Sequence, residues 1–368
     1  MANLYRADHV GSLLRPPELL RAREQYFAGQ LTSEQLLEQE DHAILGALEL
    51  QRSAGVDVLS DGEYRRTSFV IDSSKAYEGV APAARENPGW QGGDAQPLAS
   101  EMVGLTAVAK LRRVGQLVGD EASFLRQHVT GPYKVTMPTA NQLASFLYRE
   151  GVSKDAYPSQ HDLALELADF LRHEIQELID EGTPYIQIDT PSYTQFCDAQ
   201  YVQGMRDRGL DPEQVLNQWI AVDNRTLAGL RREGVTIGMH LCRGNSRGRW
   251  LSQGGYEPVA EKLFNGVDVD RFSLEYDTER AGGFEPLRFM PRNKQVVLGL
   301  ITTKEGRLEQ RDELVRSIEA AAAHAPLENM ALSPQCGFST NALGNPITMD
   351  DQRKKLAVLV ETARQVWG

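Results

Sequence analysis

The chain has 368 residues and a formal net charge of −12, so its surface repels nucleic acids and anionic membranes, and neither is expected as a partner. Hydrophobic residues make up 41% of it, which is enough for one large buried core. No apolar run is long enough to cross a bilayer, and the first residues lack the pattern of a signal peptide. Three cysteines in so long a chain argue against a disulfide framework. These properties favour a cytoplasmic enzyme.

Short runs of apolar or β-branched residues, bounded by Gly, Pro or polar residues, have the pattern of buried parallel strands. In chain order they are Leu4–Val10, Val56–Ser60, Val129–Val135, Tyr185–Asp189, Thr236–Cys242, Arg271–Tyr276, Gln295–Ile301 and Met330–Ser333. Apolar residues three and four apart predict amphipathic helices at Ser33–Ser53, Gln160–Asp180, Pro212–Glu233, Glu309–His324 and Asp350–Trp367. Ser33 is the expected N-cap of the first of these helices.

The alternation of strands and helices predicts an α/β fold, a (β/α)8 TIM barrel, as a single domain over residues 1–368. An open, doubly wound sheet is the alternative. Two features extend the minimal barrel. Ser33–Ser53 forms an extended N-terminal helix ahead of the second strand, and Ala81–Ser100, rich in Gly, Pro and Ala, is predicted to be a loop insertion.

Polar residues at strand ends are the candidates for chemistry, because active sites of such barrels lie where the strands give way to loops. These residues are His9, Ser12, Asp61, Glu63, Asp189, His240, Cys242, Glu275 and Cys336. His240 and Cys242 share one face of a strand, since side chains alternate with period two. With Glu275 and Cys336 they form a set of good ligands for Zn²⁺. The alternative is that His240 and Cys242 are core residues and that Glu275 pairs with an arginine. Cys197 is expected to be a small buried hydrophobe.

Local motifs in a fixed order support the zinc interpretation. They are HVGSLLRP at His9–Pro16, SDGEYRR at Ser60–Arg66, QIDTPSY at Gln187–Tyr193, HLCRGNSRGRW at His240–Trp250, SLEYDTERAGGFEPL at Ser273–Leu287 and LSPQCGFST at Leu332–Thr340. Together they resemble the cobalamin-independent methionine synthase family, and more specifically its short branch with a single barrel. The resemblance runs from Asp8 to Trp367.

The resemblance implies roles for the strand-end residues. His240, Cys242, Glu275 and Cys336 correspond to the four zinc ligands, which in the family bind the thiol of homocysteine. Ser12 and Glu63 fall where the family holds the amino-acid part of this substrate, and Asp189 matches a third substrate-holding position. Coordination to zinc ionises a thiol, and the thiolate is the competent nucleophile.

Three further residues have two interpretations each. His9 and Asp61 are candidate catalytic residues, but either could instead hold a loop by hydrogen bonds. Arg243 could bind an anionic group of the substrate, since guanidinium suits a carboxylate, sulfonate or phosphate. The alternative places Arg243, with Arg247 and Arg249, in a solvated loop.

The sequence departs from the family in the parts that bind the methyl donor. No tryptophan stands near Met137 and Pro138, where the family stacks its folate, and Thr302 replaces the histidine that assists protonation. Thr190 stands where the long enzymes have a glutamate, and the additional N-terminal barrel of those enzymes has no counterpart here. A folate nitrogen leaves poorly without an acid. We therefore expect a different alkyl donor, such as a methylated corrinoid or an epoxide.

These observations predict a zinc-dependent thiol alkyltransferase, with an S-methyltransferase acting on homocysteine or a similar small thiol in methionine biosynthesis as the leading hypothesis. The second hypothesis is thiol alkylation of the epoxyalkane:coenzyme M transferase type, which Arg243 would favour and pocket carboxylates would disfavour. The third is an inert barrel with a structural zinc.

Overall fold

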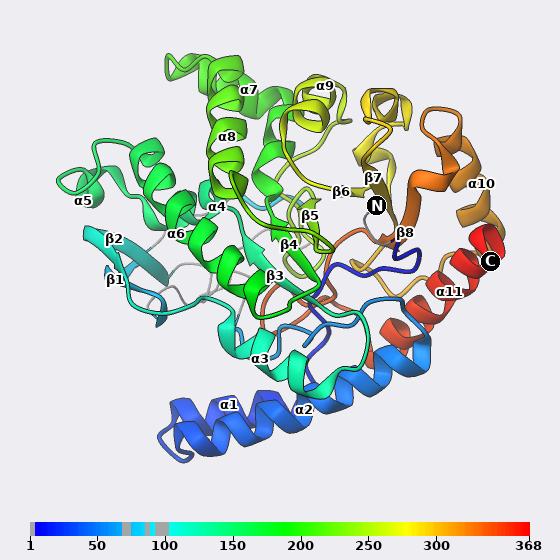
Figure 1. The fold of residues 1–368 in the computed structure, drawn as a ribbon, viewed down its shortest axis with the longest axis horizontal. Helices are drawn as coiled ribbons and strands as arrows, with labels where there is room; N and C mark the ends of the chain where they lie inside the picture. The colour runs from blue at the N-terminus through cyan, green and yellow to red at the C-terminus, as the bar shows by residue number, and fades with distance from the viewer. Residues whose placement is uncertain (1–3, 68–74, 85–88, 93–102) are drawn as a thin grey trace.

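The computed structural model describes residues 4–67, 75–84, 89–92 and 103–368, and its centre is a parallel sheet (Figure 1). Within these residues the sheet has six strands in the order β3-β4-β5-β6-β7-β8. Their bounds are Lys134–Pro138 for β3, Tyr185–Asp189 for β4, Thr236–Leu241 for β5, Arg271–Glu275 for β6, Gln295–Ile301 for β7 and Met330–Pro334 for β8. Every residue of these strands is buried, as expected where helices cover the outer face of a parallel sheet.

Two further segments close the sheet into a barrel between β8 and β3. Ala7 forms a parallel bridge with Leu332 of β8, and Leu59 forms one with Tyr133 beside β3. The two segments are joined by the Asp57 amide, which donates to the Ala7 carbonyl over 2.9 Å. The predicted α/β barrel is therefore confirmed, but the predicted strands Leu4–Val10 and Val56–Ser60 are wrong as regular strands.

Side-chain oxygens explain why the two closing segments are irregular. The amide of Ala7 donates to a carboxylate oxygen of Asp57 over 2.9 Å, and the amide of Ser60 donates to the side-chain oxygen of Gln51 over 2.8 Å. Backbone groups satisfied by side chains are not available to a strand ladder. We call residues 4–14 and 56–66 together the barrel seam.

Helices surround the barrel, and the long ones bury an apolar side (Figure 1). Their bounds are Pro17–Phe27 for α1, Ser33–Ala54 for α2, Gly119–His128 for α3, Ala140–Leu147 for α4, Glu150–Ser153 for α5, Gln160–Asp180 for α6, Ala199–Asp207 for α7, Pro212–Leu227 for α8, Glu257–Gly266 for α9, Arg311–Ala322 for α10 and Met349–Trp367 for α11. The long helices match their predicted positions closely. Pro212–Glu233 was expected to run further, but α8 ends at Leu227, two residues before Gly229, which has a φ of 72°.

The N-cap of α2 is Thr32 rather than the predicted Ser33. The Thr32 side chain accepts a hydrogen bond from the Gln35 amide, and the Gln35 side chain accepts one from the Thr32 amide. This reciprocal pair is a capping box, which requires a glutamine or glutamate three residues after the cap. Gln35 stands at that distance from Thr32, so the spacing explains the shift by one residue.

The third predicted strand, Val129–Val135, begins too early. Helix α3 ends at His128, and Gly131 has a φ of 109°, so the chain turns before β3 starts at Lys134. A φ in this range favours glycine and interrupts an extended strand.

Part of the predicted loop insertion Ala81–Ser100 is a β-hairpin. Strand β1, Tyr77–Ala84, pairs antiparallel with β2, Val103–Arg113, at one side of the barrel (Figure 1). Residues 85–88 and 93–100 of the predicted loop lie outside the described residues. Between them, Gln91 pairs with Trp250 in the loop after β5. In the part of the chain that the structure describes, no helix has the length and apolarity needed to cross a membrane.

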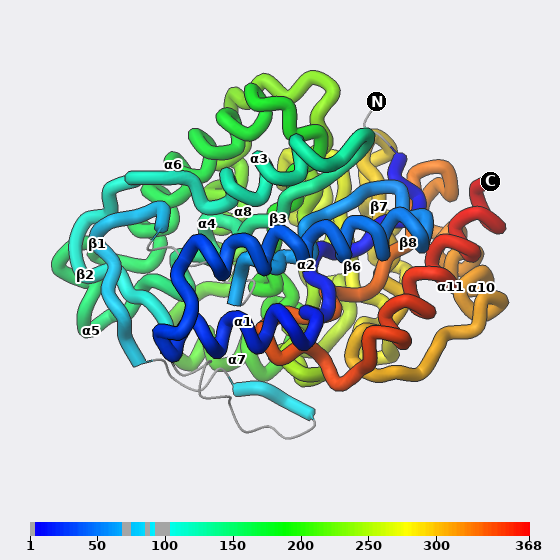
Figure 2. Tube along the Cα trace, turned by 90° about the horizontal axis from the view of Figure 1, so that it is seen from below, coloured from blue at the N-terminus to red at the C-terminus, as the bar shows by residue number. Residues whose placement is uncertain are grey.

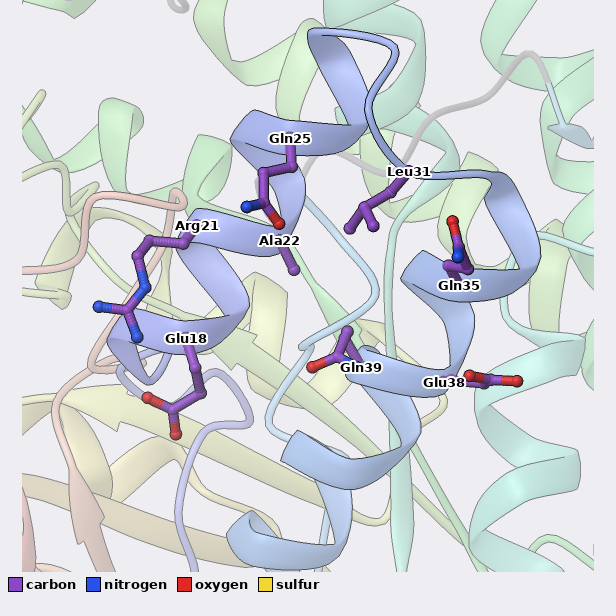
Figure 3. Close-up of a pocket in the computed structure, with 8 residues that line it drawn as sticks. All are labelled: Glu18, Arg21, Ala22, Gln25, Leu31, Gln35, Glu38 and Gln39. Atoms are coloured by element: carbon purple, nitrogen blue, oxygen red, sulfur yellow. The ribbon is translucent and has the colours of Figure 1, made fainter.

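Helices α1 and α2 run side by side on one flank, and α11 packs against α2 (Figure 2). A shallow pocket of about 350 Å³ lies between α1 and α2 (Figure 3). Its lining is mostly charged or amide-bearing, with Glu18, Arg21 and Gln39 among the side chains, and includes the apolar Ala22 and Leu31. No strand-end residue lines this pocket, so it is separate from the candidate site.

Candidate metal centre

Three of the four predicted ligands come together at the C-terminal end of the barrel. His240 lies on β5, Cys242 follows the last residue of β5, and Cys336 follows β8 by two residues. Their ligand atoms all lie within 4.8 Å of one another, and the two sulfur atoms are 3.6 Å apart. All three side chains are buried. A two-cysteine, one-histidine cluster drawn from two strands has the open fourth position of a catalytic zinc site rather than the closed shell of a structural one.

The donor set meets the geometric requirements of zinc. Sulfur ligands at tetrahedral positions about 2.3 Å from zinc lie roughly 3.8 Å apart, close to the separation seen here. The Nδ1 atom of His240 lies 3.1 Å from a carboxylate oxygen of Asp189, and its Nε2 atom faces the Gln335 carbonyl, next to Cys336. A carboxylate on one ring nitrogen fixes the tautomer in which the other nitrogen can bind a metal.

The electrostatics of the two thiols also favour a cation between them. Contact with Cys242 lowers the pKa of Cys336 well below its ordinary value, and His240 adds to this against the effect of burial. The same contact, together with burial, raises the pKa of Cys242. Burial opposes the charge on His240, but Asp189 and Cys336 raise its pKa to about 10. Two adjacent thiolates repel each other, and a divalent cation would remove this repulsion.

Glu275, the fourth predicted ligand, is fully buried at the end of β6 but does not belong to this group. One of its carboxylate oxygens accepts a hydrogen bond of 2.7 Å from the Arg243 amide, and the other accepts one of 3.1 Å from Arg280. Lys304 lies 3.5 Å from the second oxygen. Burial opposes ionisation, but Lys304, Arg243 and Arg280 lower the pKa of Glu275 to about 2. The carboxylate is therefore anionic at neutral pH.

The position of Arg243 does not match its predicted role, which was to bind an anionic group of the substrate. Its guanidinium is buried, and its nitrogens donate to the carbonyls of Gly254, Glu275 and Ala281. The group also stacks on the ring of Tyr256 at 4.5 Å. These contacts use its donors on the protein itself, so Arg243 ties the loops after β5 and β6 together.

The three residues with predicted substrate contacts lie around the ligand cluster. Asp189 bonds His240, as described above. Ser12 lies against Gly337, the residue after Cys336, where an added Cβ would come within 1.9 Å of the serine hydroxyl oxygen. Glu63 is buried, and burial and Asp189 raise its pKa while Arg66 opposes them. Asp189 therefore contacts the candidate ligand cluster directly, Ser12 lies beside the residue that follows Cys336, and Glu63 lies within electrostatic range of Asp189.

Glu63 has one satisfied and one unsatisfied carboxylate oxygen. The Thr136 hydroxyl donates to the first over 2.8 Å. The second is buried and accepts no hydrogen bond from the described residues. Asp61 fixes the turn that presents Glu63, because its carboxylate accepts a hydrogen bond of 3.0 Å from the Glu63 amide and Glu63 has a φ of 58°. An unpaired buried carboxylate oxygen is costly and marks a place for a donor from a ligand.

His9 faces the helix side of the seam. Burial and the nearby Lys134 ammonium lower its pKa to about 4, so its ring is neutral at neutral pH. The ring faces Gln51 and Val58, which belong to α2 and to the second closing segment. The catalytic role of His9 therefore stays a prediction from the sequence.

Sequence reasoning missed Asp277, Arg280 and Lys304. They form a buried charged group with Glu275, described further below. Lys304 could have been identified from the sequence, because it stands three residues after the end of β7, at the same end of the barrel as the candidate ligands.

Comparisons with known proteins agree with this geometry. The family described as "Cobalamin-independent synthase, Catalytic domain" matches residues 6–365. The uncharacterized protein YxjG of Bacillus subtilis is 35% identical over 367 residues, covering 99% of this chain and 95% of that protein. A methionine synthase of Sulfurisphaera tokodaii is 24% identical over 335 residues, covering 89% of this chain and 84% of that protein.

Solved structures share the fold. A Listeria monocytogenes protein assigned as a vitamin-B12-independent methionine synthase has a TM-score of 0.76 and 28% identity, covering 100% of this chain and 99% of that one. A B12-independent methionine synthase from Shewanella, solved with selenomethionine, has a TM-score of 0.74 and 23% identity, covering 99% and 98%. The family match spans nearly the whole chain, and the His/Cys/Cys cluster of this chain lies at the mouth of its barrel. The chain therefore belongs to the cobalamin-independent methionine synthase family.

Proposed function

We propose that this protein is a zinc-dependent S-methyltransferase that acts on homocysteine or a similar small thiol bearing an amino group. The observation that carries the proposal is the cluster of His240, Cys242 and Cys336. It is joined by Glu63, which has a buried carboxylate oxygen that accepts no hydrogen bond from the described residues and which lies within electrostatic range of Asp189. A site for such a substrate needs a metal that ionises the thiol and a hydrogen-bond acceptor for the ammonium group.

His240, Cys242 and Cys336 would hold the zinc, and Glu275 would serve as its fourth ligand in the absence of substrate. The bound zinc supplies a positive charge that keeps a substrate sulfur ionised at neutral pH. Asp189 holds the imidazole of His240 in the tautomer that the site needs. Two cysteinates would balance the charge of the zinc, so that a substrate sulfur bound beside them stays electron-rich.

The carboxylates favour an amino-acid thiol over a sulfonate thiol. Asp189 is close enough to Glu63 for its charge, together with burial, to raise the pKa of Glu63. Arg66 balances part of this negative charge, since it lies 3.6 Å from Glu63. An ammonium group would balance the remainder, and the hydroxyl of Ser12 would add a polar contact, whereas a sulfonate would be repelled by the carboxylates. The coenzyme M hypothesis loses its main support because the guanidinium of Arg243 donates to protein carbonyls.

We propose a methylated corrinoid as the methyl donor. A reactive electrophile such as an epoxide is the donor of the wider thiol-alkyltransferase alternative, in which ring opening leaves a hydroxyalkyl group on the sulfur. Met137 is fully buried at the site where the family stacks its folate, and Thr302 cannot act as an acid near neutral pH. Neither donor requires a pterin platform. Proximity of the ionised sulfur to the donor carbon then supplies most of the rate.

Calorimetric titration of the zinc-loaded protein with homocysteine, and separately with coenzyme M, tests the acceptor. Homocysteine binding with release of about one proton, measured in two buffers of different ionisation enthalpy, is the expected result. Selective binding of coenzyme M would replace this proposal by the sulfonate alternative. Binding of neither thiol, with zinc retained, would favour the inert barrel with a structural zinc.

A further inference from the structure

Four charged side chains form a buried cluster next to the metal centre. Lys304 lies 3.5 Å from Glu275 and 3.6 Å from Asp277, and Arg280 lies 3.1 Å and 3.8 Å from the same two carboxylates. The side chains of Glu275 and Asp277 are 0% exposed, and those of Lys304 and Arg280 are 9% and 13% exposed. Two cations thus face two carboxylates in a dry environment.

The charge balance of this cluster depends on the position of Glu275. With its carboxylate in the cluster, both cations are neutralised. Without it, Lys304 and Arg280 face Asp277 alone, whose two carboxylate oxygens are buried and make no hydrogen bond with the described residues. A buried charge that loses its partner is strongly destabilised. The cluster therefore attracts the Glu275 carboxylate and competes for it with any metal at the neighbouring site.

The surrounding structure holds the cluster in place. Arg280 lies under the ring of Trp250 at 4.6 Å, and Trp250 forms backbone hydrogen bonds of 2.8 and 3.1 Å with Gln91. The Arg243 amide donates to the oxygen of Glu275 that the two cations do not contact. Both Glu275 oxygens thus have partners other than His240, Cys242 and Cys336, as a stable alternative position requires.

We propose that Arg280, Lys304 and Asp277 form a resting site for the carboxylate of Glu275, and that Lys304 sets how readily Glu275 yields the metal to the substrate sulfur. This inference rests on the proposed function. The exchange breaks and forms no covalent bond of the protein. The incoming thiol loses its proton to solvent, and Glu275 moves as an anion from the metal to the two cations. Lys304 is a positioning residue in this scheme, since it acts through Glu275.

The test is the variant Lys304→Met, with two measurements on the zinc-loaded protein. Homocysteine affinity is expected to fall on the order of tenfold, because Glu275 loses part of its resting site. Release of zinc to a chelator is expected to be as slow as in the wild type or slower, because the carboxylate then favours the metal. Lys304→Arg should restore the affinity, and Lys294→Met, at the opposite end of β7, should alter neither measurement.

Each outcome has one meaning. Unchanged homocysteine affinity in Lys304→Met overturns the inference and leaves the proposed function intact. Faster release of zinc also overturns it, since that result assigns Lys304 to the support of the metal. If the wild-type protein binds no thiol, the proposed function is refuted. Slower zinc release from Lys304→Met than from the wild type would, even then, support the resting site. Lys304→Gln carries the same expectations and replaces Lys304→Met if the latter does not fold.

Discussion

Asp189 and His240 occupy directly paired positions on β4 and β5, and their side chains meet at 3.1 Å between Oδ1 and Nδ1. The parallel register therefore builds the partner of the metal-binding histidine into the sheet itself. Asp189→Ala should lower zinc affinity by roughly 10- to 100-fold, because the imidazole loses the group that orients it. Competition with a chromogenic chelator measures this. Equal zinc affinities in the variant and the wild type would contradict the orienting role.

Cys242→Ser and Cys336→Ser should each lose zinc and transferase activity. A neutral hydroxyl is a far weaker ligand than a thiolate, so the loss should exceed that of Asp189→Ala. Metal analysis after gel filtration checks this. Cys197→Ser is the matched control, because Cys197 lies in another environment, where burial raises its pKa to about 12. Stoichiometric zinc in both ligand variants would refute the assignment.

Glu63→Gln should weaken homocysteine binding about tenfold while zinc stays bound, because the variant removes a charge that faces the substrate ammonium. Titration calorimetry with homocysteine and with a thiol lacking the amino group separates the effects, since only the first ligand should bind more weakly. Glu174→Gln is a suitable control. Glu174 is a buried glutamate that accepts hydrogen bonds from the amides of Leu117 and Val118. The same loss for both ligands would argue against contact with the ammonium group.

Asp223 should make stability depend on pH. Burial raises its pKa to about 7, although Tyr193 and Asn141 donate hydrogen bonds to it. The folded chain therefore binds this proton more tightly than the unfolded chain. The resulting stabilisation is complete below the ordinary pKa of 3.8 and is lost as the pH rises through about 7.

Asp223→Asn should remove this dependence. Relative to the variant, the wild type should lose roughly 2 to 4 kcal/mol of unfolding free energy between pH 4 and pH 8. Chemical denaturation at both pH values measures the difference. Asp169→Asn, which alters an exposed partner of Arg225, should show no comparable effect. Parallel pH profiles for the wild type and Asp223→Asn would contradict the prediction.

The regular half of the barrel could be predicted because its strands carry a clear local signal. Tyr185–Asp189 and Gln295–Ile301 are short runs composed mostly of apolar or β-branched residues, and their observed bounds equal the predicted ones. Because active sites of such barrels lie at the C-terminal ends of the strands, His240, Cys242 and Cys336 could then be assigned to the same end of the barrel. Only backbone periodicity and strand direction were needed for this step.

The seam could not be predicted from periodicity, because its strand pairing consists of isolated bridges and several of its backbone amides donate to side chains. Asp8, for example, accepts a hydrogen bond of 2.8 Å from the amide of His9, next to it in the chain. The positions of Glu275 and Arg243 were also beyond local patterns. They depend on loops after β5, β6 and β7 that bring Arg280 and Lys304 beside the strand ends, and long-range ion pairs leave no periodic trace in the sequence.

The seam also has a consequence for how the protein changes over evolutionary time. Ser12 and Glu63 lie on its two segments, whereas His240 and Cys336 lie on or directly beside strands of the continuous ladder. The two halves of the site thus have separate structural supports. If the proposed function holds, substitutions in two short irregular segments would alter which thiol is accepted, while the strands that present His240 and Cys336 stay unchanged.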